Sequence, residues 1–448
     1  MGGIFSSVLK SWKRGEKEIL IGKSGSTSGR GWEKVRAGQS YLYKSRGMES
    51  EVIELRFKGK VSGSFLNQAL NMSNRRYPYM NTSMIELDGD FYIVQNPNSM
   101  VARRSQELKP LGGVGCGGHL VDITYCDRSV YFSFHHALCD GRGIKPYIET
   151  IVYYYCKLKY NVNEPPEGVR LSDDPMLPGE TADPFAQRYE YDDGKDFIAL
   201  SRDALHLPES AKRSGDTDYR YELKLRREDY LAACKRYNAT PVIFLTILMS
   251  RAILRLCPEC RKNVNANIAS DMRAELGLPN TYKNCVRTLI LPYSRVLAEK
   301  PMRGQAAELR RLLDEQRDRD MARRDANSFI SLSDRLDKYG SYEEKSGIMG
   351  FFEDMSLDTY IVSYLGQFNF GKGAGYIEEA HLYNSGAAGL GINMLCAGDS
   401  FTMDFKQSFG SSKYVDALCE ELSELGLSHS VSACIPFTTP NDSIIRRK

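Results

Sequence analysis

Residues 130–144 read VYFSFHHALCDGRGI, a stretch that joins an apolar run, two adjacent histidines and a turn with glycines. Its first five residues are apolar or small and predict a buried strand, which ends at the adjacent pair His135 and His136. The chain has only 6 histidines, so a pair at a strand end points to a functional site. The ordinary pKa of imidazole lies close to neutrality, which suits a group that accepts and returns a proton.

A turn with glycines and then a helix follow the two histidines. Beyond Gly143, apolar residues recur at helical spacing from Ile144 to Tyr155, which predicts an amphipathic helix. The motif therefore lies on a strand-to-helix connection, where glycines allow a tight turn close to a substrate. The alternative is that both histidines are packed polar groups and that Asp140 only caps the helix.

The pattern of His135, His136, three residues, Asp140 and Gly141 resembles the signature of the chloramphenicol-acetyltransferase-like superfamily. This superfamily includes BAHD acyltransferases, alcohol acetyltransferases and the condensation domains of peptide synthetases. The resemblance implies an α/β fold of two sandwich domains with a tunnel between them. It also implies that His136, His135 and Asp140 are the catalytic residues, with His136 as the general base, and that Gly141 supports the loop.

A second segment, DMRAELGLPNTYKN at residues 271–284, resembles the Asp-x-Arg strand of the same superfamily, with its proline turn and aromatic-x-Asn. By this resemblance Arg273 is the partner of Asp140, and Asn284 also supports the site. A buried carboxylate needs a counter-charge, and a guanidinium can bind it with two hydrogen bonds. The alternative is that residues 271–273 form a solvated loop.

The stretch IVSYLGQFNF at residues 361–370 reads as a strand and resembles the Ser-x-Leu-Gly strand that lines the tunnel in condensation domains and alcohol acetyltransferases. Ser363 and Gly366 would then line the substrate tunnel, although Ser363 is also explained as an ordinary strand serine. Two alternating stretches around 397–399 predict a hairpin near the C-terminus. This region lacks the Asp-Phe-Gly-Trp-Gly box of plant BAHD enzymes, which disfavours that branch.

The length of 448 residues predicts more than one domain. We expect a basic, Gly/Ser-rich and loosely packed arm at 1–46, a first acyltransferase-like domain with the histidine motif at 47–190, and a second at 191–448. Within the arm, residues 39–44 are expected to form a short strand or a cover near the site. A long charged helix is expected from Gln305 to about Asp325.

Composition restricts the partners and the compartment. The formal net charge is only +3 and the basic residues are dispersed, which gives no indication of nucleic-acid binding. The 11 cysteines show no disulfide framework, and the CxxC at 257–260 has no second pair, so we expect a reduced, cytoplasmic protein without a metal. We also expect a monomer. No apolar run is long enough to span a membrane. The start, MGGIFS, matches the short N-myristoylation pattern, which we interpret as coincidence.

These expectations together predict an acyltransferase, closest to the alcohol O-acetyltransferases. It would move an acyl group from a thioester, acyl-CoA or phosphopantetheine-bound, to the hydroxyl or amine of a small molecule, with no bound cofactor. One alternative is a condensation enzyme that forms an amide or ester and depends on an acyl carrier protein. The other is an inactive relative that binds ligands in the tunnel without chemistry.

Overall fold

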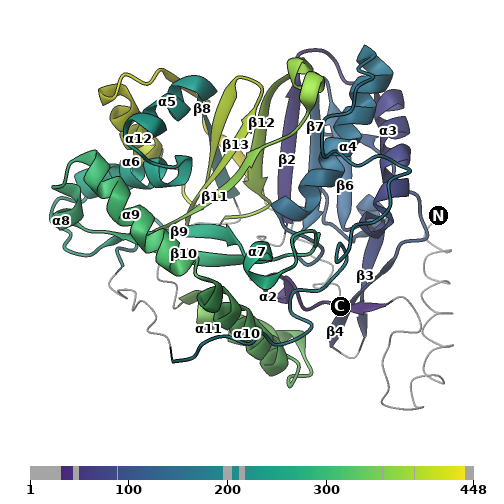
Figure 1. Cartoon of the computed structure of the whole chain (residues 1–448), viewed down its shortest axis with the longest axis horizontal. Coiled ribbons are helices and arrows are strands. Elements are labelled where there is room, and N and C mark those ends of the chain that lie inside the picture. The colour runs from purple at the N-terminus through teal and green to yellow at the C-terminus, as the bar shows by residue number, and fades with distance from the viewer. Residues whose placement is uncertain are drawn as a thin grey trace.

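The computed structural model describes residues 32–43, 50–87, 89–194, 204–210, 217–354, 358–387 and 389–438. The N-terminal MGGIFS and most of the predicted arm lie outside the described residues. The described chain forms two mixed layers of helices and strands that stand side by side (Figure 1). This is the α/β architecture that the histidine motif predicted.

The first layer is a five-stranded sheet of order β12-β2-β7-β6-β5. Its strands are β12 (Ile377–Asn384), β2 (Ser50–Phe57), β7 (Ser129–His135), β6 (Val121–Cys126) and β5 (Arg103–Arg104). Helices α3 (Gly63–Arg76) and α4 (Gly141–Tyr160) cover its outer face (Figure 1). The predicted face of α4 is buried: Ile144, Ile148 and Ile151 have at most 1% of their surface exposed. Nearby, β1 (Glu33–Lys34), β4 (Asp90–Gln95) and β3 (Thr82–Leu87) form a small sheet.

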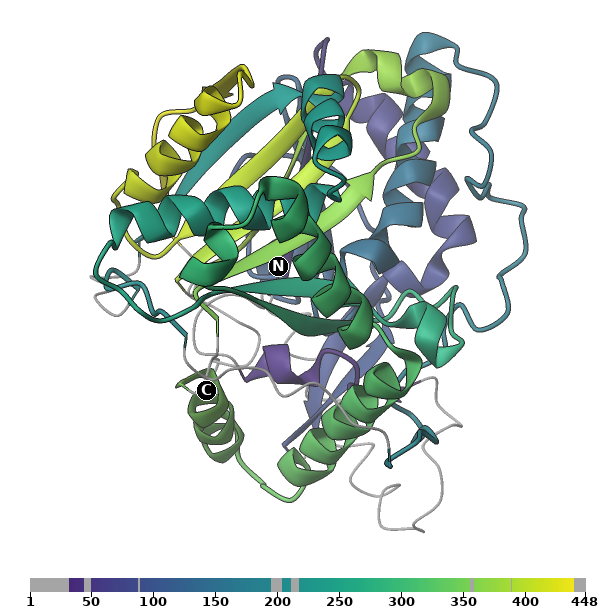
Figure 2. The same cartoon turned by 60° about the vertical axis from the view of Figure 1, so that its left-hand side comes forward.

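The second layer is an eight-stranded sheet built from the rest of the described chain. Its main path is β10 (Val286–Tyr293), β9 (Val264–Asp271), β11 (Tyr360–Gln367), β13 (Leu390–Ala397), β14 (Ser400–Gln407), β8 (Thr217–Arg226) and β15 (His429–Val431), while β16 (Ile435–Thr438) also pairs with β8. One face carries α5 (Arg227–Arg236), α6 (Pro241–Leu256), α9 (Met302–Gln316) and α12 (Lys413–Glu424) (Figure 2). α6 begins where its sequence indicates, since Thr240 caps the helix and Pro241 is its first residue. The predicted hairpin is confirmed as β13 and β14.

The remaining elements are five helices and three short stretches of 3-10 helix among the described residues. They are α2 (Gln39–Leu42), α7 (Arg273–Leu276), α8 (Arg295–Ala298), α10 (Arg319–Leu336), α11 (Tyr342–Asp354) and the 3-10 turns η2 (Pro78–Met80), η3 (Val114–Cys116) and η4 (Gly371–Tyr376). After α4, residues 161–194 run along the outside of the molecule without forming a helix or strand (Figure 2).

One strand crosses between the two halves of the sequence. β12 belongs by position to the second half, yet it pairs antiparallel with β2 at the edge of the first sheet. The division at residues 190 and 191 stays a prediction, and the sheet of the first half includes a strand from beyond it.

One expectation about helices was wrong. The single helix predicted from Gln305 to about Asp325 is two helices: α9 ends at Gln316, and Asp318 caps α10 by accepting hydrogen bonds from the N–H groups of Asp320 and Met321. Of the two alternatives for residues 39–44, a short strand or a cover near the site, the strand does not form, since residues 39–42 are helical. The described end of the arm is also not loosely packed, since Leu42 and Tyr43 are at most 2% exposed.

A largely buried cluster of charges, the interface cluster, joins the two sheets through β2, β8, β12 and β14, with Lys224 at its exposed side. Its members are Glu54, Arg56, Arg220, Glu222, Lys224, Glu379, His381 and Asp404. His381 Nδ1 lies 3.0 Å from Asp404 Oδ1, and its Nε2 lies 3.7 Å from Glu222 and 3.8 Å from Glu379. Burial by itself lowers the pKa of His381, but Asp404 and Glu379 outweigh it and raise the pKa to about 9. With His381 protonated, four cations face four carboxylates.

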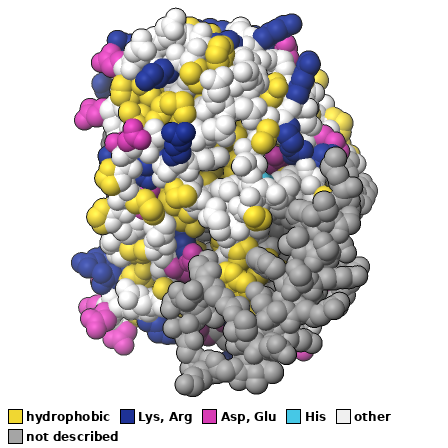
Figure 3. Space-filling model, turned by 90° about the vertical axis from the view of Figure 1, so that its right-hand side faces the viewer, with side chains coloured by type: hydrophobic (Ala, Val, Ile, Leu, Met, Phe, Trp, Pro, Cys, Tyr) yellow, Lys and Arg dark blue, Asp and Glu magenta, His cyan; other side chains and the backbone are white. Residues whose placement is uncertain are grey.

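The surface to the right of the view in Figure 1 shows no gathering of one charge. Over the described part of this face, basic and acidic side chains are scattered among apolar ones (Figure 3). Of the helices described, none alone has the length and apolar character to cross a membrane; α5 and α6 reach these values only as a pair, bent by 83°.

Candidate active site

The histidine motif lies where β7 ends and α4 begins. His135 is the last residue of β7, and Asp140 is the N-cap of α4, with its Oδ1 accepting a hydrogen bond of 2.7 Å from the N–H of Gly143. The strand and the helix therefore fix both ends of a four-residue turn. Both histidines and Asp140 are buried, with 3%, 6% and 2% of their surface exposed.

Asp140 also binds Arg273, as the resemblance implied. Arg273 Nη2 donates to Asp140 Oδ1 at 2.8 Å, and the N–H of Cys285 donates to Asp140 Oδ2 at 2.8 Å. The arginine in turn donates to the backbone carbonyls of Thr281 and Lys283, at 2.8 Å and 2.7 Å. Asp140 therefore caps α4 and also ties the motif to the connection between β9 and β10, so the two explanations of Asp140 are compatible.

Asn284 holds His136 from the same connection. Its Nδ2 donates to the backbone carbonyl of His136 at 3.2 Å and lies 3.4 Å from the ring Nδ1. The structure thus brings His136 and Asp140 together with Arg273 and Asn284, which lie more than 130 positions further along the chain. Their chemical roles stay predictions.

His135 has a different environment from His136. Its Nδ1 accepts a hydrogen bond of 3.0 Å from the N–H of Ala137, two residues along the turn. Burial, with a smaller contribution from His136, lowers the pKa of His135 to about 3. His135 is therefore neutral at physiological pH and fixes the shape of the turn.

Two residues that the sequence did not single out complete the surroundings of His136. Glu51, at the start of β2, places its Oε1 3.6 Å from His136 Nε2. The ring of Tyr41, in α2, stacks on the imidazole with 4.2 Å between ring centroids. Burial raises the pKa of Tyr41, and the charges of Glu51 and Asp140 raise it further, so its phenol stays protonated. The expectation that residues 39–44 cover the site is confirmed for residues 39–42.

The glycines of the turn allow close approach of other segments. A Cβ on Gly143 would lie 1.8 Å from the carbonyl oxygen of Tyr282, so only glycine fits there. A Cβ on Gly141 would lie 3.2 Å from the side chain of Leu365, in β11. Gly141 therefore faces β11, and Leu365 is the residue of that strand that approaches the turn.

Ser363 and Gly366 lie on the same strand, β11, on either side of Leu365. Both are partly exposed, and Gly366 has a left-handed backbone with φ of 81°. β11 thus lies close to the histidine motif, while a tunnel lined by Ser363 and Gly366 stays a prediction.

The arrangement supports proton transfer at His136. The distance of 3.6 Å from Nε2 to Glu51 is too long for a hydrogen bond, so this carboxylate does not occupy the ring nitrogen.

Comparison with solved structures gives the fold. No protein-family model matches the sequence, and no curated protein is similar to it. Polyketide synthase associated protein 5 from Mycobacterium tuberculosis is 11% identical, with a TM-score of 0.56 over 88% of this chain and 98% of that one. TRI101 of F. sporotrichioides, complexed with coenzyme A and T-2, is 12% identical, with a TM-score of 0.53 over 89% and 99%. The first condensation domain of the CDA synthetase is 15% identical, with a TM-score of 0.53 over 89% and 95%.

These similarities extend over 88–89% of this chain. The chain therefore shares the α/β fold of these structures, which is the fold that the resemblance of the histidine motif implied.

Proposed function

We propose that this protein is an acyltransferase that moves an acyl group from a thioester to the hydroxyl or amine of a small molecule. The observation that carries the proposal is the buried His136, held by Asn284 and placed beside the Glu51 carboxylate. A buried imidazole beside a carboxylate is suited to general base catalysis. No metal or redox cofactor is needed for the reaction of a thioester.

In the proposed reaction, the acceptor oxygen or nitrogen attacks the thioester carbonyl carbon and its proton moves to His136 Nε2. A new carbon–oxygen or carbon–nitrogen bond forms, the carbon–sulfur bond breaks, and the proton passes from His136 to the leaving thiolate. Glu51 stabilises the imidazolium between these two transfers. Asp140 and Arg273 do not exchange protons; they hold the turn in place.

Solved structures of the same fold support this chemistry by analogy. The TRI101 structures contain coenzyme A with T-2 or deoxynivalenol, and TRI3 is described as a trichothecene 15-O-acetyltransferase. We propose acyl-CoA as the donor and an alcohol as the acceptor, in the manner of the alcohol O-acetyltransferases. A carrier-bound phosphopantetheine thioester is the alternative donor, since condensation domains share the fold.

The test measures free-thiol release from a panel of acyl-CoAs, with mixed alcohols and amines present. We expect release that depends on an acceptor, and a loss of about 10²–10⁴-fold in His136→Ala. His429→Ala is the matched control, because His429 lies in β15 and hydrogen-bonds the carbonyl of Leu427. Equal rates for His136→Ala and the wild type would exclude His136 as the base. No release from any acyl-CoA, followed by none from acyl carrier proteins, would exclude acyl transfer.

A further inference from the structure

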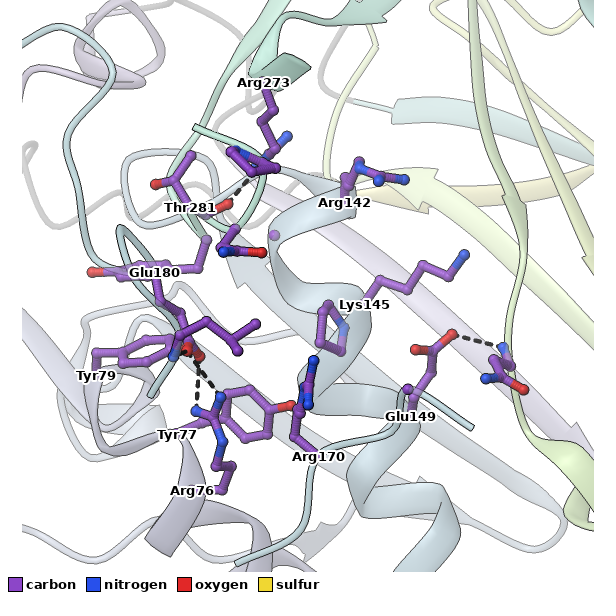
Figure 4. Close-up of a pocket in the computed structure, with 18 residues that line it drawn as sticks. Arg76, Tyr77, Tyr79, Arg142, Lys145, Glu149, Arg170, Glu180, Arg273 and Thr281 are labelled. Atoms are coloured by element: carbon purple, nitrogen blue, oxygen red, sulfur yellow. Dashed lines mark hydrogen bonds and ion pairs between the residues drawn. The ribbon is translucent and has the colours of Figure 1, made fainter. Parts of the chain in front are cut away.

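The cavity beside the first turn of α4 pairs charges within its own walls. Figure 4 shows Arg76 joined to Glu180, through two hydrogen bonds of 2.8 Å and 2.9 Å. Glu180 also accepts a hydrogen bond from Tyr79, which lines the same cavity. A chemically reactive pair lies elsewhere, at the end of α6, where the free thiols of Cys257 and Cys260 occur three positions apart.

These two cysteines are the first and last residues of a tight turn between α6 and β9. The turn Cys257-Pro258-Glu259-Cys260 follows Leu256, the last residue of α6, and the N–H of Cys260 donates to the carbonyl of Cys257 at 3.1 Å. Proline favours such a turn at its second position, because its ring fixes φ near about −65°. The first and last Cα atoms of a four-residue turn lie within about 7 Å, and a disulfide joins Cα atoms about 4.4–6.8 Å apart. The turn therefore holds the two cysteines at a separation that a disulfide can span.

One arginine fixes both ends of the turn. Arg295, in α8, donates from Nη2 to the carbonyl of Cys257 at 2.7 Å and from Nε to the carbonyl of Cys260 at 2.9 Å. The same Nη2 also donates to the carbonyl of Leu254 at 3.4 Å. Because a guanidinium is planar and rigid, these bonds set the orientation of the two cysteines relative to α6. The turn is thus ordered while both sulfur atoms are still thiols.

Both thiols lie between the core and the solvent. Cys257 and Cys260 are partly exposed and pack against the hydrophobic core of the second layer, while Pro258 and Glu259 at the corner of the turn are exposed. No other two of the 11 cysteines are so close in the sequence. A small thiol reagent can therefore reach this pair at the surface.

The surroundings of the pair do not stabilise a thiolate. Burial raises the pKa of the Cys257 thiol, and the nearby cations Lys413 and Arg295 offset this only in part. A disulfide is strongly oxidising when the protein stabilises its reduced form, as a low thiol pKa does. Since this environment gives the reduced form no such advantage, it does not oppose closure of a disulfide.

We infer that Cys257 and Cys260 form a reversible disulfide, with a small-molecule disulfide such as oxidised glutathione as the oxidant. The thiolate of one cysteine attacks a sulfur of the oxidant, which forms a mixed disulfide and releases one glutathione thiolate. The thiolate of the other cysteine then attacks the protein sulfur of this mixed disulfide and releases the second glutathione. The two protein thiols lose two electrons and two protons, which the oxidant takes up as two molecules of reduced glutathione. This inference is independent of the proposed acyl transfer.

Equilibration of the native full chain in mixtures of reduced and oxidised glutathione, followed by acid quenching, alkylation and peptide mass mapping, tests the inference. Trypsin releases residues 256–261 as one peptide, so the disulfide appears as an unalkylated peptide that is lighter by two hydrogens. The midpoint is the ratio [GSH]²/[GSSG] at which half of this peptide is oxidised. We expect the midpoint to be about tenfold higher for the native chain than for the chain unfolded in urea, because the fold holds the turn closed.

Two substitutions define the chemistry further. In Cys260→Ser, Cys257 should keep one bound glutathione, because the thiol that would release it is missing. Cys434→Ser is the control: Cys434 is exposed and lies outside the turn, so its loss should leave the midpoint of peptide 256–261 unchanged.

Three results would overturn the inference: two alkyl groups on the wild-type peptide at every ratio, one glutathione on each of its cysteines, or equal midpoints for the native and unfolded chains. Arg295→Gln removes the donors to both carbonyls of the turn. A lower native midpoint in this variant would support the ordered turn as the cause of closure, and an unchanged midpoint would contradict it.

Discussion

Replacing Arg273 with methionine should destabilise the folded chain far more than the same replacement at Arg142. Both guanidinium groups contact the carboxylate of Asp271 at similar distances, 2.8 Å and 2.9 Å. They differ in exposure: the side chain of Arg273 is 3% exposed, and that of Arg142 is 61% exposed. The comparison therefore separates a buried pair from an exposed one on the same carboxylate.

The expected magnitude follows from what each substitution leaves behind. Arg273→Met leaves the buried Asp140 carboxylate without its counter-charge and removes the donors to two backbone carbonyls. Breaking a buried ion pair in this way costs about 3–5 kcal/mol. Arg142→Met breaks an exposed pair, which contributes about 0.2–1 kcal/mol. Adding Asp140→Asn to Arg273→Met removes the uncompensated charge, so the double variant should recover about 1–3 kcal/mol.

Equilibrium unfolding in urea, followed by circular dichroism at pH 7, measures these differences. The order of stability should be wild type, Arg142→Met, the double variant, and then Arg273→Met. Free energies of unfolding of Arg273→Met and Arg142→Met that agree within about 1 kcal/mol would refute this reasoning. A double variant that is no more stable than Arg273→Met would refute it as well.

Three further predictions concern the cover of the site and the interface cluster. Gly38→Ala places a Cβ 2.1 Å from the carbonyl oxygen of His136 at a φ of 75°, so it should cost clearly more than the roughly 1–2 kcal/mol of backbone strain alone. Gly277→Ala, with φ of 72° and no atom within 4 Å of the added Cβ, should show only that strain in the same urea titration. Tyr41→Leu removes the ring stacked on His136 and should lower kcat in the thiol-release assay, whereas Tyr41→Phe keeps the ring and most of the rate; equal rates would speak against the stacking. The pKa of His381 is raised to about 9 in the folded state, so its stabilisation is full below pH 6.5 and is lost as the pH rises through 9. The free energy of unfolding should fall by about 3 kcal/mol over this range, and a fall of the same size in His381→Gln would contradict the assignment.

The sequence predicted those parts of the site whose chemistry and spacing are local. The histidine pair, Asp140 and the glycines occur within nine residues, and the helical spacing after them defines α4. Arg273 and Asn284 were predicted only by resemblance, because nothing in their own segments shows that they face the motif. The structure places both against it.

Glu51 and Tyr41 were missed because long-range pairing brings them to His136. Glu51 enters the site through the register of β2 on β7, where it lies opposite Phe134. An acidic residue at the start of the strand was a usable signal, but it does not identify the partner strand. Tyr41 belongs to a four-residue helix, and such a short element has no periodicity to detect. The break between α9 and α10 was missed because Asp318, which caps α10, is one charged residue within a charged stretch of sequence.

The crossing of β12 has a consequence for the order in which the protein can fold during translation. β2, β7 and β6 leave the ribosome early, but the strand that covers the open edge of β2 is complete only at residue 384. Until then β2 presents unpaired N–H and C=O groups along its edge, which can pair with another nascent chain. The first sheet can therefore be completed only after β12 has been synthesised, late in translation. A fragment that stops before residue 377 should aggregate when it is expressed alone.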